Sequence, residues 1–206
     1  MQIIVLANDS LRKELLNNGV QSKGELIWIL DPKDFLNYSH AVACIDLLFE
    51  KSEERLNILK QISGLVIINS VVHTLKETDS GFVRINAWNS FLQANLIEAA
   101  SPDENKQTTE DVFAQFNKKI EWLPDEAGFV TPRVISMIIN EAYISLEEGV
   151  SSKEEIDKAM KLGTNYPYGP FEWAEKIGQE NVASLLQKLS GKDQRYQPSL
   201  LMQQVS

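Results

Sequence analysis

Apolar residues in the first third of the chain form short continuous runs, separated by segments with helical periodicity. The runs predicted as buried strands are residues 3–6, 26–30, 41–49 and 65–68. Residues 11–17 and 52–62 have the spacing of amphipathic helices. Strands that alternate with helices predict a parallel sheet covered by helices. Residues 101–109 are polar, and we expect them to form a loop that leads into another helix.

From residue 131 onward the pattern becomes helical throughout. Thr131 precedes Pro132, which predicts a hydroxyl N-cap followed by proline at the first helical position. One buried face is predicted for Val134, Ile135, Ile138, Ile139, Ala142, Tyr143 and Leu146. Gly149 offers a left-handed stop to this helix.

Two further helices follow in the sequence. Ser151 and Glu154 form a capping-box pattern, and Gly163 is expected to close the second helix. Its apolar residues are Ile156, Ala159, Met160 and Leu162. A rigid turn at residues 166–170 then brings Phe171 and Trp173 to the start of a third helix, where both aromatic rings can be buried. The pattern therefore predicts an all-α domain after the α/β domain.

Composition narrows the possible partners. The 206 residues carry a net charge of -9, so a nucleic acid or an anionic membrane surface would be repelled. The single cysteine, Cys44, lies in an apolar run and is assigned to the core; one cysteine fits a reducing compartment. No apolar run is long enough to span a bilayer, and residues 1–6 lack the basic leader of a signal peptide. We expect a cytoplasmic protein.

A series of short motifs marks the helical domain. In order they are GFV, PR, NEA, LEEGV, IDKAM, LG, YP and GPFEW within residues 128–178, and RYQPSLL at residues 195–201. This succession resembles the C-terminal domain of the 3-hydroxyacyl-CoA dehydrogenase family, and most of its members stand at caps and turns. The resemblance implies a reduced Rossmann-like parallel sheet domain at residues 1–124, followed by an all-α C-terminal domain at 125–206. It also implies a homodimer through the helical domain and an acyl-CoA ligand.

The dinucleotide loop of that family departs from its pattern here. A GxGxxG turn after the first strand lets the backbone approach a pyrophosphate. On that pattern the three glycines fall on Ala7, Asp9 and Arg12, so side chains and a carboxylate occupy the space of the phosphates. Asp31 matches the acidic residue that would hold the ribose of NAD, but Asp before Pro32 is also an ordinary turn starter, which we favour. We therefore expect no bound cofactor. The connection after Asp31 is also shorter than the family's.

The family's catalytic dyad is half retained. Its pattern, close to GLHFFNPVPVMKLVEV, falls on RINAWNSFLQANLIEA from Arg84, which places Asn86 at the histidine and Glu98 at the glutamate. An amide does not titrate near neutral pH, so Asn86 cannot replace the histidine as general base. Glu98 is either a remaining hydrogen-bond acceptor, which we favour, or a buried acid with a raised pKa. Asn89 falls on the family's asparagine and is the expected substrate contact.

Other candidate residues are weaker. The family's substrate-contacting asparagine in GFxxNR becomes Pro132, whereas Arg133 remains. Its loop serine lies in NTS, for which this chain offers Asn69 and Ser70, and Ser70 is the candidate. His73 could substitute as a base or could simply start a helix, and we favour the helix start. His40 is expected in a surface loop. With one cysteine and two isolated histidines, the sequence predicts no metal site.

These departures lead to three hypotheses. The first is a protein that binds an acyl-CoA-type ligand, or acts as a dimeric scaffold, without dehydrogenase activity. The alternative is an active NAD-dependent 3-hydroxyacyl-CoA dehydrogenase of fatty acid metabolism that uses unconventional residues or a partner chain. The third is a purely structural subunit. NADH-dependent turnover of acetoacetyl-CoA separates the first two.

Overall fold

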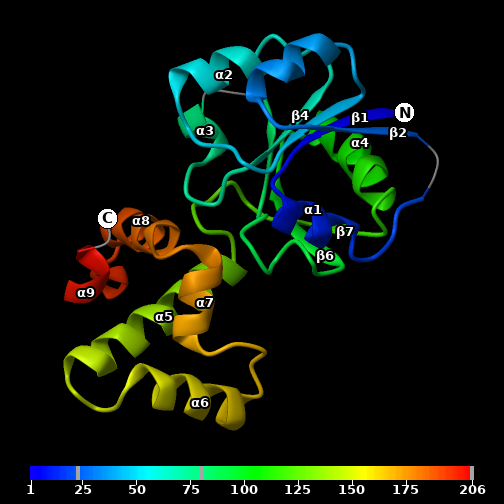
Figure 1. Cartoon of the computed structure of the whole chain (residues 1–206). Helices are drawn as coiled ribbons and strands as arrows, with labels where there is room; N and C mark the ends of the chain where they lie inside the picture. Colours follow the sequence, from blue (N-terminus) through cyan, green and yellow to red (C-terminus); the bar gives the residue numbers. More distant parts are fainter. Residues whose placement is uncertain (22–23, 79–80, 205–206) are drawn as a thin grey trace. The chain divides into compact units, whose positions relative to one another are not determined.

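The computed structural model describes residues 1–21, 24–78 and 81–204. The chain divides into two compact units, Met1–Phe129 and Val130–Ser206 (Figure 1). The sequence pattern instead places the boundary between residues 124 and 125.

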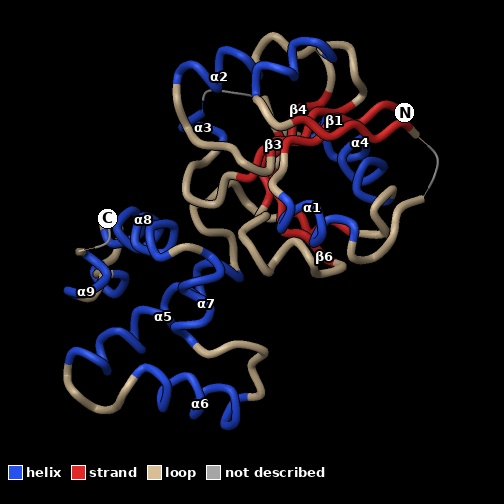
Figure 2. The backbone as a smooth tube through the Cα atoms, in the orientation of Figure 1, coloured by secondary structure: helices blue, strands red, loops and turns tan. Residues whose placement is uncertain are grey.

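The N-terminal unit is built on a seven-stranded sheet, shown in red in Figure 2. Its strands are β1 (Gln2–Leu6), β2 (Glu25–Ile29), β3 (Ala43–Asp46), β4 (Leu65–Asn69), β5 (Val83–Ile85), β6 (Leu96–Ala100) and β7 (Lys119–Trp122). They lie in the order β2-β1-β3-β4-β5-β6-β7, and every neighbouring pair is parallel except the antiparallel pair β5 and β6. The runs predicted as strands all form strands of this sheet.

Helices cover both faces of the sheet, as the apolar strands require. On one face, α1 (Asp9–Leu16) and α4 (Asp103–Ala114) pack against one cluster of buried side chains. On the other face, η1 (Pro32–Tyr38), α2 (Glu53–Leu59) and α3 (Leu75–Thr78) contribute to a second cluster. Cys44 is fully buried, and this burial raises the pKa of its thiol to about 12. The cysteine is a core residue.

The sheet lacks one strand of the common doubly wound order. That order, 3-2-1-4-5-6, places two strands on one side of the first strand. Here only β2 lies on that side, because η1 leads from β2 directly to β3 on the opposite side of β1. The short segment after Asp31 is thus long enough for a 3₁₀ turn and no more. The predicted fold, a reduced Rossmann-like sheet followed by helices, is confirmed.

The expectation that residues 101–109 form a loop is wrong. Helix α4 already begins at Asp103, directly after Pro102. Its buried residues are Thr109, Val112 and Phe113, so most of the first two turns faces solvent and carries no apolar pattern. The amphipathic signal therefore appears only at the C-terminal end of this helix.

The C-terminal unit is entirely helical. Its elements are α5 (Thr131–Glu147), α6 (Lys153–Thr164), α7 (Pro170–Ile177), α8 (Gln179–Ser190), η2 (Gln194–Tyr196) and α9 (Leu200–Gln203). Phe171 and Trp173 are buried at the start of α7, as predicted, and the ring centroids of Phe171 and Tyr143 are 4.9 Å apart. Among the described helices, none is long and apolar enough to cross a membrane.

The predicted helix ends in this unit are shifted by one or two residues. Thr131 is the first residue of α5 and not its cap, which places Pro132 at the second position. Ser152, not Ser151, caps α6 by accepting a hydrogen bond from the Glu155 amide. Gly163, which was expected to close α6, lies inside the helix, and Asn165 closes it with φ 57°. Gly149 does adopt the predicted left-handed stop, with φ 70°.

The core of α6 also differs from the expected apolar face. Asp157 is its buried residue, and it accepts hydrogen bonds from the amides of Phe171 and Glu172. Its carboxylate thereby caps α7 from a neighbouring helix. Leu162 is 78% exposed. The apolar side chains of α6 therefore lie largely on the surface of this unit.

Candidate functional site

The antiparallel pairing of β5 and β6 brings Asn86 and Glu98 together. Ile85 pairs with Ala99, so Asn86, the residue after β5, falls opposite Glu98. The Asn86 amide nitrogen of the backbone donates to the Glu98 carbonyl at 2.9 Å, and Asn86 Nδ2 donates to Glu98 Oε2 at 3.1 Å. The two residues that the resemblance assigns to the family's dyad are thus in direct contact.

This pair contains no general base at the position of the histidine. The Asn86 side chain is buried; its Nδ2 is used by Glu98, and its Oδ1 lies 3.4 Å from the Trp88 amide nitrogen. A carboxamide can hold a carboxylate by a hydrogen bond, but it takes up no proton near neutral pH. The pair can orient or bind a polar group. It cannot exchange a proton through residue 86.

Asn69, rather than Ser70, organises the end of β4. Its Nδ2 donates to the carbonyls of Leu47 and Ala87, and its Oδ1 accepts from the Ala87 amide at 3.0 Å. The adjacent Ser70 is buried, and its hydroxyl donates to the His73 carbonyl at 2.8 Å. The Ser70 hydroxyl therefore stabilises the turn before α3. His73 lies in this turn and is half-buried.

Sequence reasoning missed a buried arginine beside this turn. Arg84 is fully buried in β5; its Nε lies 2.6 Å from Asp125 Oδ1, and its Nη1 donates to the Ser70 carbonyl at 3.0 Å. It also donates to the Glu126 carbonyl, and its guanidinium lies 4.0 Å from the centroid of the Phe129 ring. Burial lowers the pKa of Arg84, and the Asp125 carboxylate opposes that shift. Arg84 thus joins the end of β4 to the segment after β7.

The turn between β1 and α1 does not form a phosphate cradle. Asn8 caps α1, and its Oδ1 accepts from the Leu11 amide at 2.9 Å. None of residues 7–11, all of which are described, has the positive φ that a glycine-rich turn provides. Asp9 stands exposed in the first turn of the helix, and the Arg12 guanidinium lies over the Trp28 ring at 4.6 Å. These residues do not fit the pyrophosphate of NAD.

Asp31 has a structural role in the turn after β2. Its Oδ1 accepts from the Lys33 amide at 2.8 Å and caps η1, as the turn interpretation requires. Asp31 also lines a pocket of about 460 Å³ at the carboxyl ends of β1, β2 and β3. Its charged lining comprises Asp31, Lys33, Glu50, Glu54 and Arg55. Three carboxylates against two cations make this lining unfavourable for an anion.

A buried ion pair borders the same pocket. Asp46, at the end of β3, is fully buried and lies 2.8 Å from Arg55 Nε. Burial raises the pKa of Asp46 to about 7, although the Arg55 charge and the Leu48 amide hydrogen bond both act to lower it. The sequence signal for this pair is an acidic residue, Asp46, inside the apolar run 41–49. Arg55 also donates to the Leu48 carbonyl, so the pair fixes the segment between β3 and α2.

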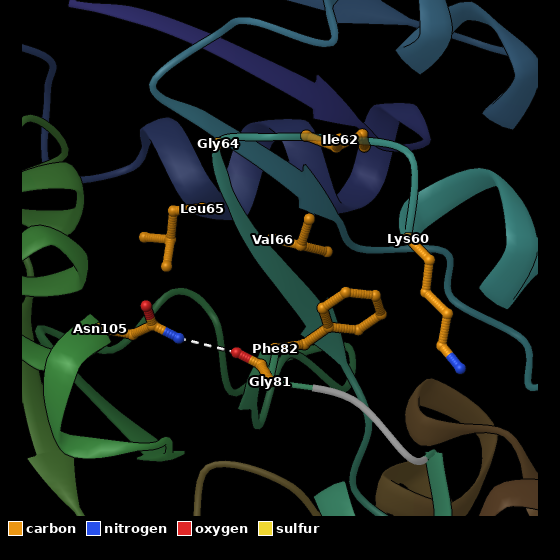
Figure 3. A pocket seen from close by; sticks show the side chains of 8 residues that line it. All are labelled: Lys60, Ile62, Gly64, Leu65, Val66, Gly81, Phe82 and Asn105. Carbon is orange, nitrogen blue, oxygen red and sulfur yellow. Dashed lines mark hydrogen bonds between the residues drawn. The ribbon is translucent and has the colours of Figure 1, made fainter.

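A second pocket, of about 410 Å³, lies at the opposite edge of the sheet. Figure 3 shows Ile62, Val66 and Phe82 in its lining, together with Lys60 and with Asn105, which donates to the Gly81 carbonyl at 2.7 Å. This pocket is at the amino ends of β4 and β5. Ligands of open α/β sheets bind at the carboxyl ends, where Asn86 and Glu98 lie.

The remaining predicted residues are Asn89, His40, Pro132 and Arg133. Asn89 is half-buried in the loop between β5 and β6, and the exposed His40 has its Nδ1 3.3 Å from the Ser63 hydroxyl. In the C-terminal unit, Pro132 is buried near the start of α5, and the Arg133 guanidinium lies 5.9 Å from the Tyr196 ring centroid. Across the described ranges, no group of three or more His, Cys, Asp or Glu side chains could hold a metal ion.

Comparison with known proteins agrees with the motifs of the helical unit. Residues 128–206 match the family model for the 3-hydroxyacyl-CoA dehydrogenase C-terminal domain. The chain is 37% identical over 108 residues to the 3-hydroxyadipyl-CoA dehydrogenase of Escherichia coli, which covers 52% of this chain and 23% of the relative. It is 30% identical over 166 residues to the 3-hydroxybutyryl-CoA dehydrogenase of Clostridioides difficile, covering 70% and 59% respectively. The chain thus spans less than two thirds of the length of these relatives.

A solved structure with a similar fold is also a 3-hydroxyacyl-CoA dehydrogenase by name. The crystal structure of (S)-3-hydroxybutyryl-CoA dehydrogenase from Ralstonia eutropha aligns with a TM-score of 0.77 at 19% identity, over 98% of this chain and 92% of that one. At this identity the likeness concerns the fold alone. Together with the family match of the helical domain and the two curated relatives, it shows that the chain belongs to the 3-hydroxyacyl-CoA dehydrogenase family.

Proposed function

We propose that this protein binds an acyl-CoA-type ligand and does not oxidise it. The observation that carries the proposal is the hydrogen bond from Asn86 Nδ2 to Glu98 Oε2, 3.1 Å long, at the place of the family's histidine and glutamate. The pair retains the carboxylate and its orienting contact, but it has lost the group that takes the substrate's proton. Loss of general base catalysis alone costs about a hundredfold to ten-thousandfold in rate.

The turn after β1 supports the same conclusion independently. An NAD pyrophosphate needs free backbone amides at a helix N-terminus. Here the Leu11 amide is used by the Asn8 side chain, and Asp9 adds a negative charge to the first helical turn. A carboxylate about 4 Å from a phosphate costs about 1 kcal/mol in water and about 4 kcal/mol at an effective dielectric of 20. The proposal therefore includes no cofactor.

The relatives supply the chemical class of the ligand. Their names describe dehydrogenases of 3-hydroxyacyl thioesters of CoA. Asn89, Asn86 and Glu98 remain as polar groups at the carboxyl edge of the sheet, and an amide or carboxylate can bind a hydroxyl or carbonyl without reacting with it. Ser70 supports the site indirectly, because its hydroxyl stabilises the turn before α3.

We extend the proposal to a homodimer formed by the helical unit. Several apolar side chains of this unit are exposed, namely Val134 (52%), Val150 (68%) and Leu162 (78%). Val134 lies on α5, Leu162 on α6 and Val150 between these two helices. Exposed apolar residues of this size favour an interface with a partner. A symmetric dimer is the commonest assembly of soluble proteins.

One finding favours the alternative, an active NAD-dependent 3-hydroxyacyl-CoA dehydrogenase. All the curated relatives compared above are dehydrogenases. In that alternative His73, in the turn held by Ser70, would be the base. The cofactor would then have to bind without the cradle that the turn after β1 lacks.

Titration calorimetry tests the proposal. We expect acetoacetyl-CoA to release or absorb heat with a saturable curve, and NADH to give no more than dilution heat. Glu98→Gln is expected to weaken binding of acetoacetyl-CoA. Tight binding of NADH would contradict the claim that the cofactor site is lost. Absence of acetoacetyl-CoA binding would contradict the claim that the protein binds an acyl-CoA.

Replacing Asn86 with histidine tests whether the dyad geometry survives. In an Asn86→His variant the new imidazole faces the Glu98 carboxylate, which favours its protonated form and raises its pKa. We expect the imidazole pKa, measured by NMR titration, to be higher by about one unit than in the Asn86→His/Glu98→Gln double variant. Burial lowers both values alike, so the difference isolates Glu98. Equal pKa values in the two variants would show that residues 86 and 98 are not paired.

A further inference from the structure

The loop between β5 and β6, residues 86–95, is held by side chains that are distant in the sequence. Its first part is fixed by Asn69, which bonds both the amide and the carbonyl of Ala87. Trp88 and Leu92 are buried at 6% and 0% exposure. The loop carries Asn86 and Asn89, the polar residues of the candidate site, and its conformation therefore sets where their side chains lie.

Glu14 of α1 holds the middle of the loop. Its two carboxylate oxygens accept from the Ser90 amide at 2.8 and 3.0 Å. Ser90 has φ 79°, a left-handed conformation that is costly for any residue except glycine. Backbone strain of this kind is of order 1–3 kcal/mol and persists only where the surroundings impose it. Here the Ser90 amide donates charge-assisted hydrogen bonds to Glu14, and these bonds hold the conformation.

Lys118 holds the end of the loop. It is 3% exposed, and its Nζ donates to the carbonyls of Leu92 and Ala94 at 2.7 and 3.0 Å. Burial lowers the pKa of this ammonium, and the charge of Glu14 opposes the shift. Lys118 and Glu14 therefore act on the same loop from the segments before β7 and after β1. Lysine is almost never buried to this degree without such partners.

We infer that Glu14 and Lys118 are positioning residues of the ligand site, because they hold the loop that carries Asn86 and Asn89 in its strained conformation. This inference rests on the proposed ligand binding. A preformed loop loses no conformational entropy when the ligand binds. Removal of either charge loosens the loop and is therefore expected to reduce affinity, although neither side chain contacts the ligand. The fixed conformation also explains why a serine rather than a glycine is tolerated at φ 79°.

The test compares four variants of the full chain: Glu14→Ala, Ser90→Gly, the double variant Glu14→Ala/Ser90→Gly, and Lys118→Met. Lys119→Met is the matched control, because Lys119 is the exposed neighbour of Lys118. The readouts are the Kd for acetoacetyl-CoA and the hydrogen exchange rate of the amides of residues 88–94. We expect Glu14→Ala and Lys118→Met to raise the Kd about tenfold and Lys119→Met to leave it unchanged. Ser90→Gly in the Glu14→Ala background is expected to restore most of the affinity, because glycine adopts the left-handed conformation without strain.

Two outcomes would overturn the inference: a Kd unchanged by Glu14→Ala, or a loss that Ser90→Gly fails to restore. The exchange measurement needs no ligand. If the unaltered chain binds no acetoacetyl-CoA, the proposed function fails, and the role of Glu14 is judged by exchange alone. Faster exchange of the loop amides in Glu14→Ala would then support a held loop, and unchanged exchange would refute it.

Discussion

Replacing Arg84 with methionine is expected to destabilise the N-terminal unit by about 3–5 kcal/mol, the usual cost of breaking a buried ion pair. The variant removes the partner of Asp125, the donors to the carbonyls of Ser70 and Glu126, and the contact with the Phe129 ring. The Asp125 carboxylate also caps α3 through the Leu75 amide, so the loss extends to the turn after β4. Urea unfolding followed by fluorescence measures the change.

Arg12→Met is the matched control for this prediction. Arg12 is exposed, and its guanidinium contacts only one ring that the structure records, that of Trp28. An exposed cation–π contact contributes about 0.5–1 kcal/mol. If Arg84→Met costs no more than Arg12→Met, the buried network is not what stabilises this part of the unit.

Replacing Gly169 with alanine is expected to destabilise the helical unit by about 2–4 kcal/mol, the sum of overpacking and a lost cap. The added Cβ would overlap Cβ, Cγ and Oδ1 of Asp157, whose side chain is buried. Asp157 would then lose its hydrogen bonds to the amides of Phe171 and Glu172, which begin α7. Thermal unfolding monitored by circular dichroism measures the loss.

Gly163→Ala provides the control in the same unit. Gly163 lies inside α6, and an added Cβ would meet nothing within 4 Å. Alanine in a helix is favoured over glycine by about 0.5–1 kcal/mol, so this variant is expected to be slightly more stable. A Gly169→Ala variant as stable as the unaltered chain would show that Asp157 can relax at no cost.

The sequence alone predicted strands β1 to β4, and with them the fold class, because these strands are almost purely apolar runs. Such runs leave little choice of structure. The family followed from the motifs of the helical unit. The caps were displaced for a physical reason: Ser151 and Ser152 both carry the right hydroxyl, and only the backbone conformation decides between them. Likewise the first residues of α4 face solvent and are polar, so residues 103–108 have the composition of a loop.

The contacts of the site join residues that are far apart in the sequence, so a local sequence pattern does not predict them. Arg84 lies between Val83 and Ile85 in a buried strand, and its partner Asp125 follows 41 residues later. Glu14 and the Ser90 amide are 76 residues apart in the sequence. The family motif brought Asn86 and Glu98 to attention as positions, and the register of β5 and β6 accounts for their contact. The sequence favoured Ser70 over Asn69 because a hydroxyl was expected at this position. In the structure the Asn69 amide holds the backbone of Leu47 and Ala87.

The most direct test of the account is NADH oxidation by the purified full chain with acetoacetyl-CoA as substrate, followed by absorbance. The account predicts no oxidation above the rate without protein, because Asn86 provides no base and the turn at Asn8 and Asp9 provides no phosphate cradle. Sustained oxidation that Glu98→Gln abolishes would contradict it.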